Sequence, residues 1–231
     1  MNKVAFILGY MDKVATGRYL GDTLRYIREQ EDDSPRVYDD RGHRTIGMGY
    51  QLNPQSVERA RRLLPHLADK DFEQWELSPI ESRTLTYGHI NEVVLPEIRK
   101  AIPRFDEFPP DTKKYMISEW YRGMLGQSPK TIGHINAGDW RAASTEYLDA
   151  EDYRNSSGGV RGRMEALSNN MYAQADPEEA RRIAENTYVV QPRDTLGAIS
   201  RSIGIPLSEL VRLNNIENPN RISVGQRLRI R

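Results

Sequence analysis

The sequence predicts an α+β protein with a bilobal, mainly helical domain that carries a small β-hairpin lobe, followed by a small domain of βααβ order. Helix-spaced apolar residues dominate the first 175 residues, one hairpin signal lies near residue 40, and a strand–helix–helix–strand pattern occupies the tail. A chain of 231 residues is long enough for one medium and one small domain. We expect these domains over residues 1–175 and 188–231, joined by a linker over residues 176–187.

The first helix is predicted from the apolar residues Leu20, Leu24 and Ile27, which are three to four positions apart and mark one helix face. This spacing places Glu31 at the end of the helix, in line with the buried face. A carboxyl group is therefore expected at the edge of the helix core.

A hairpin follows, because the tripeptide Asp40-Arg41-Gly42 is typical of a tight turn in which glycine takes a positive φ angle. The tripeptide Thr45-Ile46-Gly47 then forms the return strand. The sequence thus predicts one carboxylate at a helix end and another at a hairpin turn.

The later helices have recognisable start signals. Ser78 can cap a helix with Pro79 in its first turn and Glu81 completing a capping box, and this helix is expected to run towards Lys100 with a kink at Pro96. Further helices are expected after residues 109–111, after residues 137–140 and over residues 160–173.

The tail has its own pattern of short elements. A strand is expected at residues 188–190, helices after residue 194 and over residues 206–213, and a closing strand at residues 227–230. About 45 residues are enough for a small separate domain only.

Composition excludes several classes of function. The chain has no cysteine, which excludes disulfides and thiolate metal sites. Its 33 basic and 33 acidic residues give no net positive charge, so no nucleic-acid partner is expected. His43, His66, His89 and His134 are scattered without metal-ligand spacing, so no metal is expected.

We also expect no stable membrane insertion. The apolar run at residues 4–11 is broken by Asp12 and is too short to span a bilayer. A signal peptide is not favoured, because no small-residue cleavage pattern follows. We expect this run to lie in a buried helix or strand.

The two carboxylates have the chemistry that glycoside hydrolysis needs. One carboxyl group must donate a proton to the leaving oxygen, and the other must be ionised to activate water or attack the sugar. Spacing alone leaves a second interpretation open, a solvated acidic face. The acidic residues of this stretch are Glu29, Glu31, Asp32, Asp33, Asp39 and Asp40.

The stretch from Glu31 to the pentapeptide Thr45-Ile46-Gly47-Met48-Gly49 resembles the phage-type lysozymes, the T-even phage lysozyme-like glycoside hydrolases. The resemblance implies that Glu31 is the general acid and that Thr45 helps to place the attacking water. The catalytic Asp is either Asp40, counted forward from Glu31, or Asp39, counted back from Thr45. Strand alternation favours Asp40.

The resemblance extends to about residue 173 with departures. The family usually has Gly and His where this chain has Asp32 and Tyr50. Arg161 and Arg163 lie in a segment similar to the one that closes the family's cleft, where an arginine could pair with peptide-stem carboxylates.

The tail resembles LysM modules, which bind N-acetylglucosamine-containing glycans in a shallow groove. The resemblance rests on the Tyr188-Val189-Val190 strand, the Asn214-Asn215-Ile216 segment and the Val224-Gly225-Gln226 segment, with Arg193 where the family usually has Gly. An alternative role for Asp194 and Asn214 is helix capping. The resemblance implies glycan contacts from Asp194, Thr195, Leu196, Gly197, Asn218, Pro219, Asn220, Arg221 and Ile222.

Together the resemblances imply a monomeric, endolysin-type N-acetylmuramidase that cleaves the β-1,4 bond between N-acetylmuramic acid and N-acetylglucosamine in bacterial peptidoglycan, without a metal or organic cofactor. We expect it to accumulate in the cytoplasm of the host bacterium before release to the wall, or to be carried in a virion. The alternatives are a lytic transglycosylase and a non-catalytic wall-binding or virion structural protein.

Overall fold

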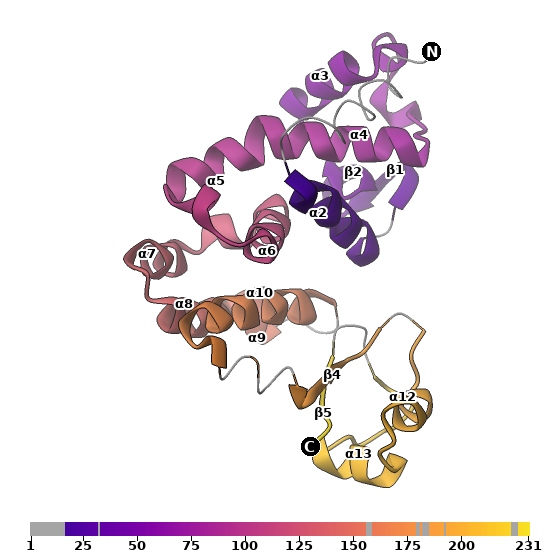
Figure 1. The fold of residues 1–231 in the computed structure, drawn as a ribbon. Coiled ribbons are helices and arrows are strands. Elements are labelled where there is room, and N and C mark those ends of the chain that lie inside the picture. Colours follow the sequence, from indigo (N-terminus) through magenta and orange to yellow (C-terminus); the bar gives the residue numbers. More distant parts are fainter. Residues whose placement is uncertain are drawn as a thin grey trace. The chain divides into compact units, whose positions relative to one another are not determined.

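The computed structural model describes residues 17–31, 33–155, 159–178, 181, 185–191, 193–222 and 226–231 (Figure 1). The apolar run at residues 4–11, Asp32 and part of the expected linker lie outside these ranges. The chain divides into two compact units, one ending at Met124 and one beginning at Leu125.

The predicted fold class is confirmed, because the described residues form a mainly helical α+β structure with two small antiparallel sheets. One sheet has the strand order β1-β2-β3 and the other pairs β4 with β5. None of the described helices is long and apolar enough to cross a membrane.

The first described helix is α2 (Gly17–Gln30), and Glu31 follows it directly. Leu20, Leu24 and Ile27 are all buried, which confirms the predicted apolar face. Helix α2 packs against α6 (Pro110–Tyr121) within the same unit.

The hairpin joins β1 (Asp33–Asp40) to β2 (His43–Met48), and β3 (Tyr50–Gln51) extends the sheet. Its turn consists of Arg41 and Gly42, with φ angles of 53° and 89°. Two consecutive positive φ angles are those of a type I′ turn, whose twist matches that of the flanking strands. The predicted tight turn is therefore confirmed.

The core of the sheet lobe is covered by α3 (Pro54–Leu63), which begins at a capping box between Asn53 and Ser56. The sequence did not predict this helix, because its apolar face is short and includes only Val57 and Ala60 among buried apolar residues. The buried members of this core are Ile46, Tyr50, Val57, Ala60, Leu64, Leu67, Trp75, Leu77 and Leu85.

The predicted long helix is present with an irregularity in its middle. Helix α4 (Pro79–His89) begins at the Ser78–Glu81 capping box, continues through a π-helical turn, η3 (Ile90–Val94), and ends as α5 (Leu95–Ala101). Pro96 has no N–H to donate along the helix, so the irregularity next to it is the expected result of a proline inside a helix.

The second unit begins with helices that pack around α8. Helix α8 (Trp140–Leu148), capped by Asp139, packs against both α7 (Pro129–Ala137) and α10 (Gly159–Ala175). Helices α8 and α10 were predicted, whereas α7 and the five-residue α9 (Glu151–Asn155) were not. Across both units, short 3₁₀ helices also lie between the longer elements. They are η1 (Pro65–Leu67), η2 (Phe72–Gln74), η4 (Phe105–Glu107) and η5 (Leu125–Gln127).

The tail has the predicted βααβ order, with β4 (Thr187–Val189), α12 (Leu196–Ile203), α13 (Leu207–Leu213) and β5 (Arg227–Arg229). A small core of its own holds these elements together. Its buried members are Val190, Leu196, Ile199, Leu210 and Leu228.

We expect His89 to make stability depend on pH. Burial, with the nearby Arg59 as a second cause, lowers the pKa of His89 from 6.5 to about 4, so between these values the unfolded chain binds the proton that the folded chain rejects. The free energy of unfolding should therefore fall by about 3 kcal/mol between pH 7 and pH 4 on account of this residue. Urea unfolding of the chain and of its His89→Gln variant measures the difference, and parallel pH dependence in the two proteins would contradict the assignment.

Candidate functional site

The Glu31 carboxylate lies at the C-terminal end of α2, where its backbone N–H still donates to the Ile27 carbonyl at 3.0 Å. Its side chain is 25% exposed. The turn between β2 and β3 approaches it closely, because a Cβ atom added to Gly49 would lie 3.7 Å from Glu31 Oε2. The predicted general acid is thus partly buried against the Gly47-Met48-Gly49 segment.

Arg122 binds this carboxylate, and sequence reasoning had missed it. Arg122 Nε donates to Glu31 Oε1 at 2.6 Å, and the arginine side chain is only 8% exposed. Arg122 follows the last residue of α6, and Gly123 after it has a φ angle of 77°, which is typical of a helix C-terminus. Because the partners are 91 positions apart in the chain, no local pattern could reveal the pair.

The Arg122 guanidinium has further partners on its own helix. Nη1 donates to the Ser118 hydroxyl and lies 3.5 Å from Glu119 Oε1. The Glu119 side chain is 2% exposed. Nη2 has no hydrogen-bond partner among the described residues. Arg122 therefore lies between two carboxylates, one partly exposed and one fully buried.

A second contact fixes the strand end beside Glu31. Ser82 of α4 donates to Asp33 Oδ1 at 2.6 Å and accepts from the Met48 N–H at 3.2 Å. A Cβ atom at Gly47 would collide with the Ser82 side chain, and its φ angle is 61°. Only glycine fits at position 47, so the close packing of β2 on α4 depends on it.

Tyr121 ties the same strand end to α6. Its hydroxyl donates to the Met48 carbonyl at 3.0 Å. Burial raises the pKa of Tyr121, with the nearby Glu31 carboxylate as a further cause, so the phenol stays protonated and keeps donating. The end of α6 thus holds both the carboxylate and the turn beside it.

The two candidate aspartates occupy different positions in the hairpin. Asp39 pairs with Arg44, and its Oδ1 accepts from the Gly42 N–H at 2.9 Å. Asp40 pairs with His43, and Tyr38 pairs with Thr45, so Asp40 shares a sheet face with Thr45 and Asp39 does not.

Thr45 is almost completely buried, at 1% exposure. Its hydroxyl donates to the His43 carbonyl at 3.1 Å. Because the hydroxyl proton of Thr45 is already donated to His43, the Thr45 oxygen can only accept a hydrogen bond from another group.

Arg161 and Arg163 lie on α10, in the other unit from Glu31. The Arg161 guanidinium stacks over the Tyr153 ring at 4.9 Å and donates to the Tyr153 carbonyl at 3.5 Å. The described contacts of Arg161 are therefore with its own unit.

In the tail, the loop predicted to bind glycans is held by Asp194. Its Oδ2 accepts from the Gln191 N–H at 2.7 Å and from the Tyr188 hydroxyl at 2.9 Å. The alternative that Asp194 caps the next helix is wrong, because Thr195 is the N-cap of α12 and accepts from the Ala198 N–H. Leu196 is a core residue, whereas Gly197 is half-buried.

The second predicted loop is exposed from Asn218 to Arg221, and Ile222 packs against the core. Asn218 shapes it, because its Oδ1 accepts from the Asn220 N–H at 3.0 Å and its carbonyl accepts from the Arg221 N–H at 2.9 Å. These exposed amide groups are suited to hydrogen bonding with a polar ligand.

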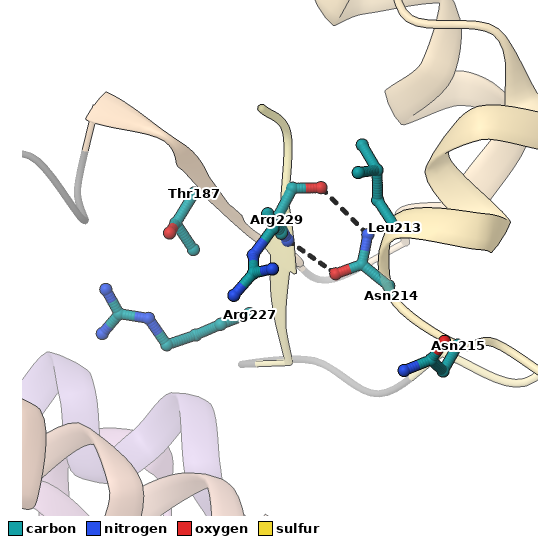
Figure 2. A pocket seen from close by; sticks show the side chains of 6 residues that line it. All are labelled: Thr187, Leu213, Asn214, Asn215, Arg227 and Arg229. Atoms are coloured by element: carbon teal, nitrogen blue, oxygen red, sulfur yellow. Dashed lines mark hydrogen bonds between the residues drawn. The ribbon is translucent and has the colours of Figure 1, made fainter.

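A shallow pocket of about 340 Å³ lies elsewhere on the tail, beside β5 (Figure 2). Asn214 closes one side, since its amide donates to the Arg229 carbonyl at 2.9 Å and its oxygen accepts from the Arg229 N–H at 2.6 Å. Its lining contains none of the residues predicted to contact glycans, and consists of Thr187, Leu213, Asn214, Asn215, Arg227 and Arg229.

Comparison with known families identifies the tail. The family model described as LysM domain matches residues 188–231. These residues form a LysM domain. The N-acetylmuramoyl-L-alanine amidase XlyA of Bacillus subtilis is 52% identical over 40 residues, which cover 17% of this chain and 14% of the amidase.

A longer similarity relates the chain to a phage protein. The endolysin of Bacillus phage B103 is 30% identical over 129 residues, which cover 50% of this chain and 48% of the endolysin. The chain thus spans about half the length of this relative and much less of the amidase.

We predict that Arg193→Gly stabilises the LysM domain. The Asp194 N–H donates to the Gln191 carbonyl at 3.1 Å, closing a turn in which Arg193 has a φ angle of 72°. A side chain in this conformation costs about 1 kcal/mol relative to glycine. Hydrogen exchange of residues 188–231, followed by mass spectrometry, should show slower exchange in the variant. Arg221→Gly, in an exposed loop, is the control, and equal or faster exchange in Arg193→Gly would disprove the prediction.

Proposed function

We propose that this protein is an endolysin-type peptidoglycan hydrolase, with a first unit that cleaves the glycan strands and a LysM domain that binds the wall. The observation that carries the proposal is the partly buried Glu31 carboxylate, held by Arg122 beside the Gly47-Met48-Gly49 segment. The similarity to the phage B103 endolysin supports it. The similarity to the amidase lies in 40 residues only, so amidase activity is not part of the proposal.

The finer proposal is an N-acetylmuramidase that inverts the anomeric carbon. Glu31 protonates the leaving glycosidic oxygen, and an ionised aspartate activates water on the opposite face of the sugar. Arg122 binds Oε1 of Glu31, so Oε2, the oxygen nearer Gly49, is the one that carries the proton. No step of this reaction requires a metal or an organic cofactor.

Asp40 is the better candidate for the aspartate. Asp39 accepts a hydrogen bond from the Gly42 N–H and so stabilises the turn, whereas Asp40 lies on the same face of the sheet as Thr45. The two-residue turn also favours Asp40. Between Glu31 and Thr45 the chain is one residue shorter than the family pattern. If Asp40 is the catalytic aspartate, the missing residue falls at the tip of the hairpin, where the turn is short. Thr45 then accepts a hydrogen bond from the attacking water.

The LysM domain supplies wall binding by the exposed loop at residues 218–221 and the Asp194–Gly197 turn. Binding a second site on an insoluble polymer raises the local concentration of the enzyme and strengthens weak capture. Arg161 and Arg163 are proposed to meet peptide-stem carboxylates. We further propose that the protein acts as a monomer and accumulates in the host cytoplasm before it reaches the wall.

Mass spectrometry of the fragments released from purified peptidoglycan tests the proposed reaction. Reducing ends at muramic acid are the expected result. Anhydro-muramic ends would instead indicate a transglycosylase, in which neither aspartate activates water. Wall binding without released fragments would indicate a wall-binding protein that does not cleave glycan strands.

We predict that Glu31→Gln lowers the rate of glycan cleavage by a factor of about 10²–10⁴, because the amide cannot donate the proton. Release of soluble fragments from purified walls measures the rate. Glu29→Gln, which removes an exposed carboxylate from the same helix, is the matched control and should keep the wild-type rate. Equal activity of the two variants would remove Glu31 from the mechanism.

The neighbouring aspartates allow a second comparison. Asp40→Asn should reduce cleavage about 10²-fold or more by removing the base for the attacking water, while Asp39→Asn should keep most of the activity. Both variants are compared in the same fragment-release assay, and thermal unfolding is used to verify that neither substitution unfolds the protein. The reverse order of activities would assign the role to Asp39.

A further inference from the structure

The charges around Arg122 do not balance as a simple ion pair. Its guanidinium contacts Glu31 through Nε and Glu119 through Nη1, and the arginine and Glu119 side chains are 8% and 2% exposed. Burying a carboxylate such as Glu119 costs several kcal/mol unless it is paired. One cation is therefore shared by two carboxylates, and the proposed mechanism uses only one of them.

The need for the second carboxylate follows from the role proposed for Glu31. A cation beside a carboxyl group favours its ionised form, whereas a general acid has to take up a proton before each turnover. An unshared Arg122, at 2.6 Å and out of water, would oppose that protonation. A second buried carboxylate on the same guanidinium weakens this effect.

We propose that Glu119 is a positioning residue for the glycan-cleaving reaction, which holds the Arg122 guanidinium in place and shares its charge so that Glu31 can be protonated. The inference rests on the proposed function. In this role Glu119 acts on Glu31 through Arg122, which lies three positions further along, at the end of α6.

The other groups that face this pair do not supply the same charge. On α6, Ser118 offers a neutral hydroxyl and Tyr121 is a phenol whose pKa is raised by burial. From the sheet, Gly49 has no side chain, and burial likewise raises the pKa of Tyr50. Asp33 is bound to Ser82. Glu119 is thus the buried carboxylate that contacts Arg122 through Nη1, while Glu31 contacts the same guanidinium through Nε.

The variant Glu119→Gln tests the inference, because glutamine keeps an oxygen for Nη1 and removes the charge. The pH dependence of kcat/KM for glycan cleavage is measured in the full chain. The basic limb of the profile, which reports loss of the proton from the general acid, should move to lower pH by about one pH unit. At a pH above the limb the rate should fall about tenfold. Asp111→Asn removes an exposed carboxylate from the start of the same helix and should leave the profile unchanged.

The outcomes separate this inference from the proposed function. An active Glu119→Gln variant with an unchanged profile would overturn the inference and leave the proposed function standing. An inactive wild-type chain would overturn the proposed function. ¹³C NMR titration of the Glu31 carboxyl group in both proteins tests the charge sharing separately, and an identical titration of Glu31 in the two proteins would overturn the inference whatever the activity.

A double-mutant comparison covers the case in which Glu119→Gln does not fold. Glu119→Gln with Arg122→Gln removes both charges at once, so the basic limb should stay close to the wild-type position if Glu119 offsets Arg122 in the wild type. A limb that lies more than about one pH unit higher would mean that Arg122 acts on Glu31 without this offset, and would overturn the inference. Where Glu119→Gln does fold, adding it to Arg122→Gln should shift the limb far less than it does in the wild type.

Discussion

The contact between Glu31 and Arg122 joins the ends of two helices that are far apart in the chain. Helix α2 ends at Gln30 and α6 ends at Tyr121, so the two charged side chains meet where both helices stop. The contact requires α2 and α6 to pack along their apolar faces. It also requires partners for the buried arginine, because an unpaired buried charge would destabilise the fold. The geometry of the site is therefore a consequence of helix packing and charge balance together.

Two glycines shape the part of the sheet that lies beside this pair. Gly47 lets β2 lie directly on Ser82, whereas a Cβ atom at Gly49 would only be in ordinary contact with the Glu31 carboxylate. Both have positive φ angles, which residues with a Cβ atom rarely adopt. The Thr-Ile-Gly-x-Gly motif thus has a physical reason at each glycine: the first permits packing on a helix, and the second permits the positive φ angle of the turn between β2 and β3.

The LysM domain is stabilised on different principles. Its core is small, and much of its order comes from side chains that hydrogen-bond to the backbone. Asp194 holds the first loop, and Asn214 bonds both backbone groups of Arg229. The domain contains seven arginines against three acidic residues, although the whole chain is neutral. Leu228 lies in the core while Arg227 and Arg229 are exposed, so part of this positive charge lies on the outer face of β5.

The sequence by itself determined the elements whose signals are local. The Leu20–Leu24–Ile27 face, the Arg41-Gly42 turn, the Ser78 capping box and the βααβ order all depend on neighbours within a few positions, where periodicity and φ preference act. Helices α3 and α7 were missed because their apolar faces are short. The tertiary structure alone decided the partners of Glu31, since Arg122 and Glu119 are about 90 positions away and a charged residue at a helix end has many possible partners. It also separated Asp39 from Asp40, because strand register, which sequence counting left open, determines which aspartate shares a face with Thr45.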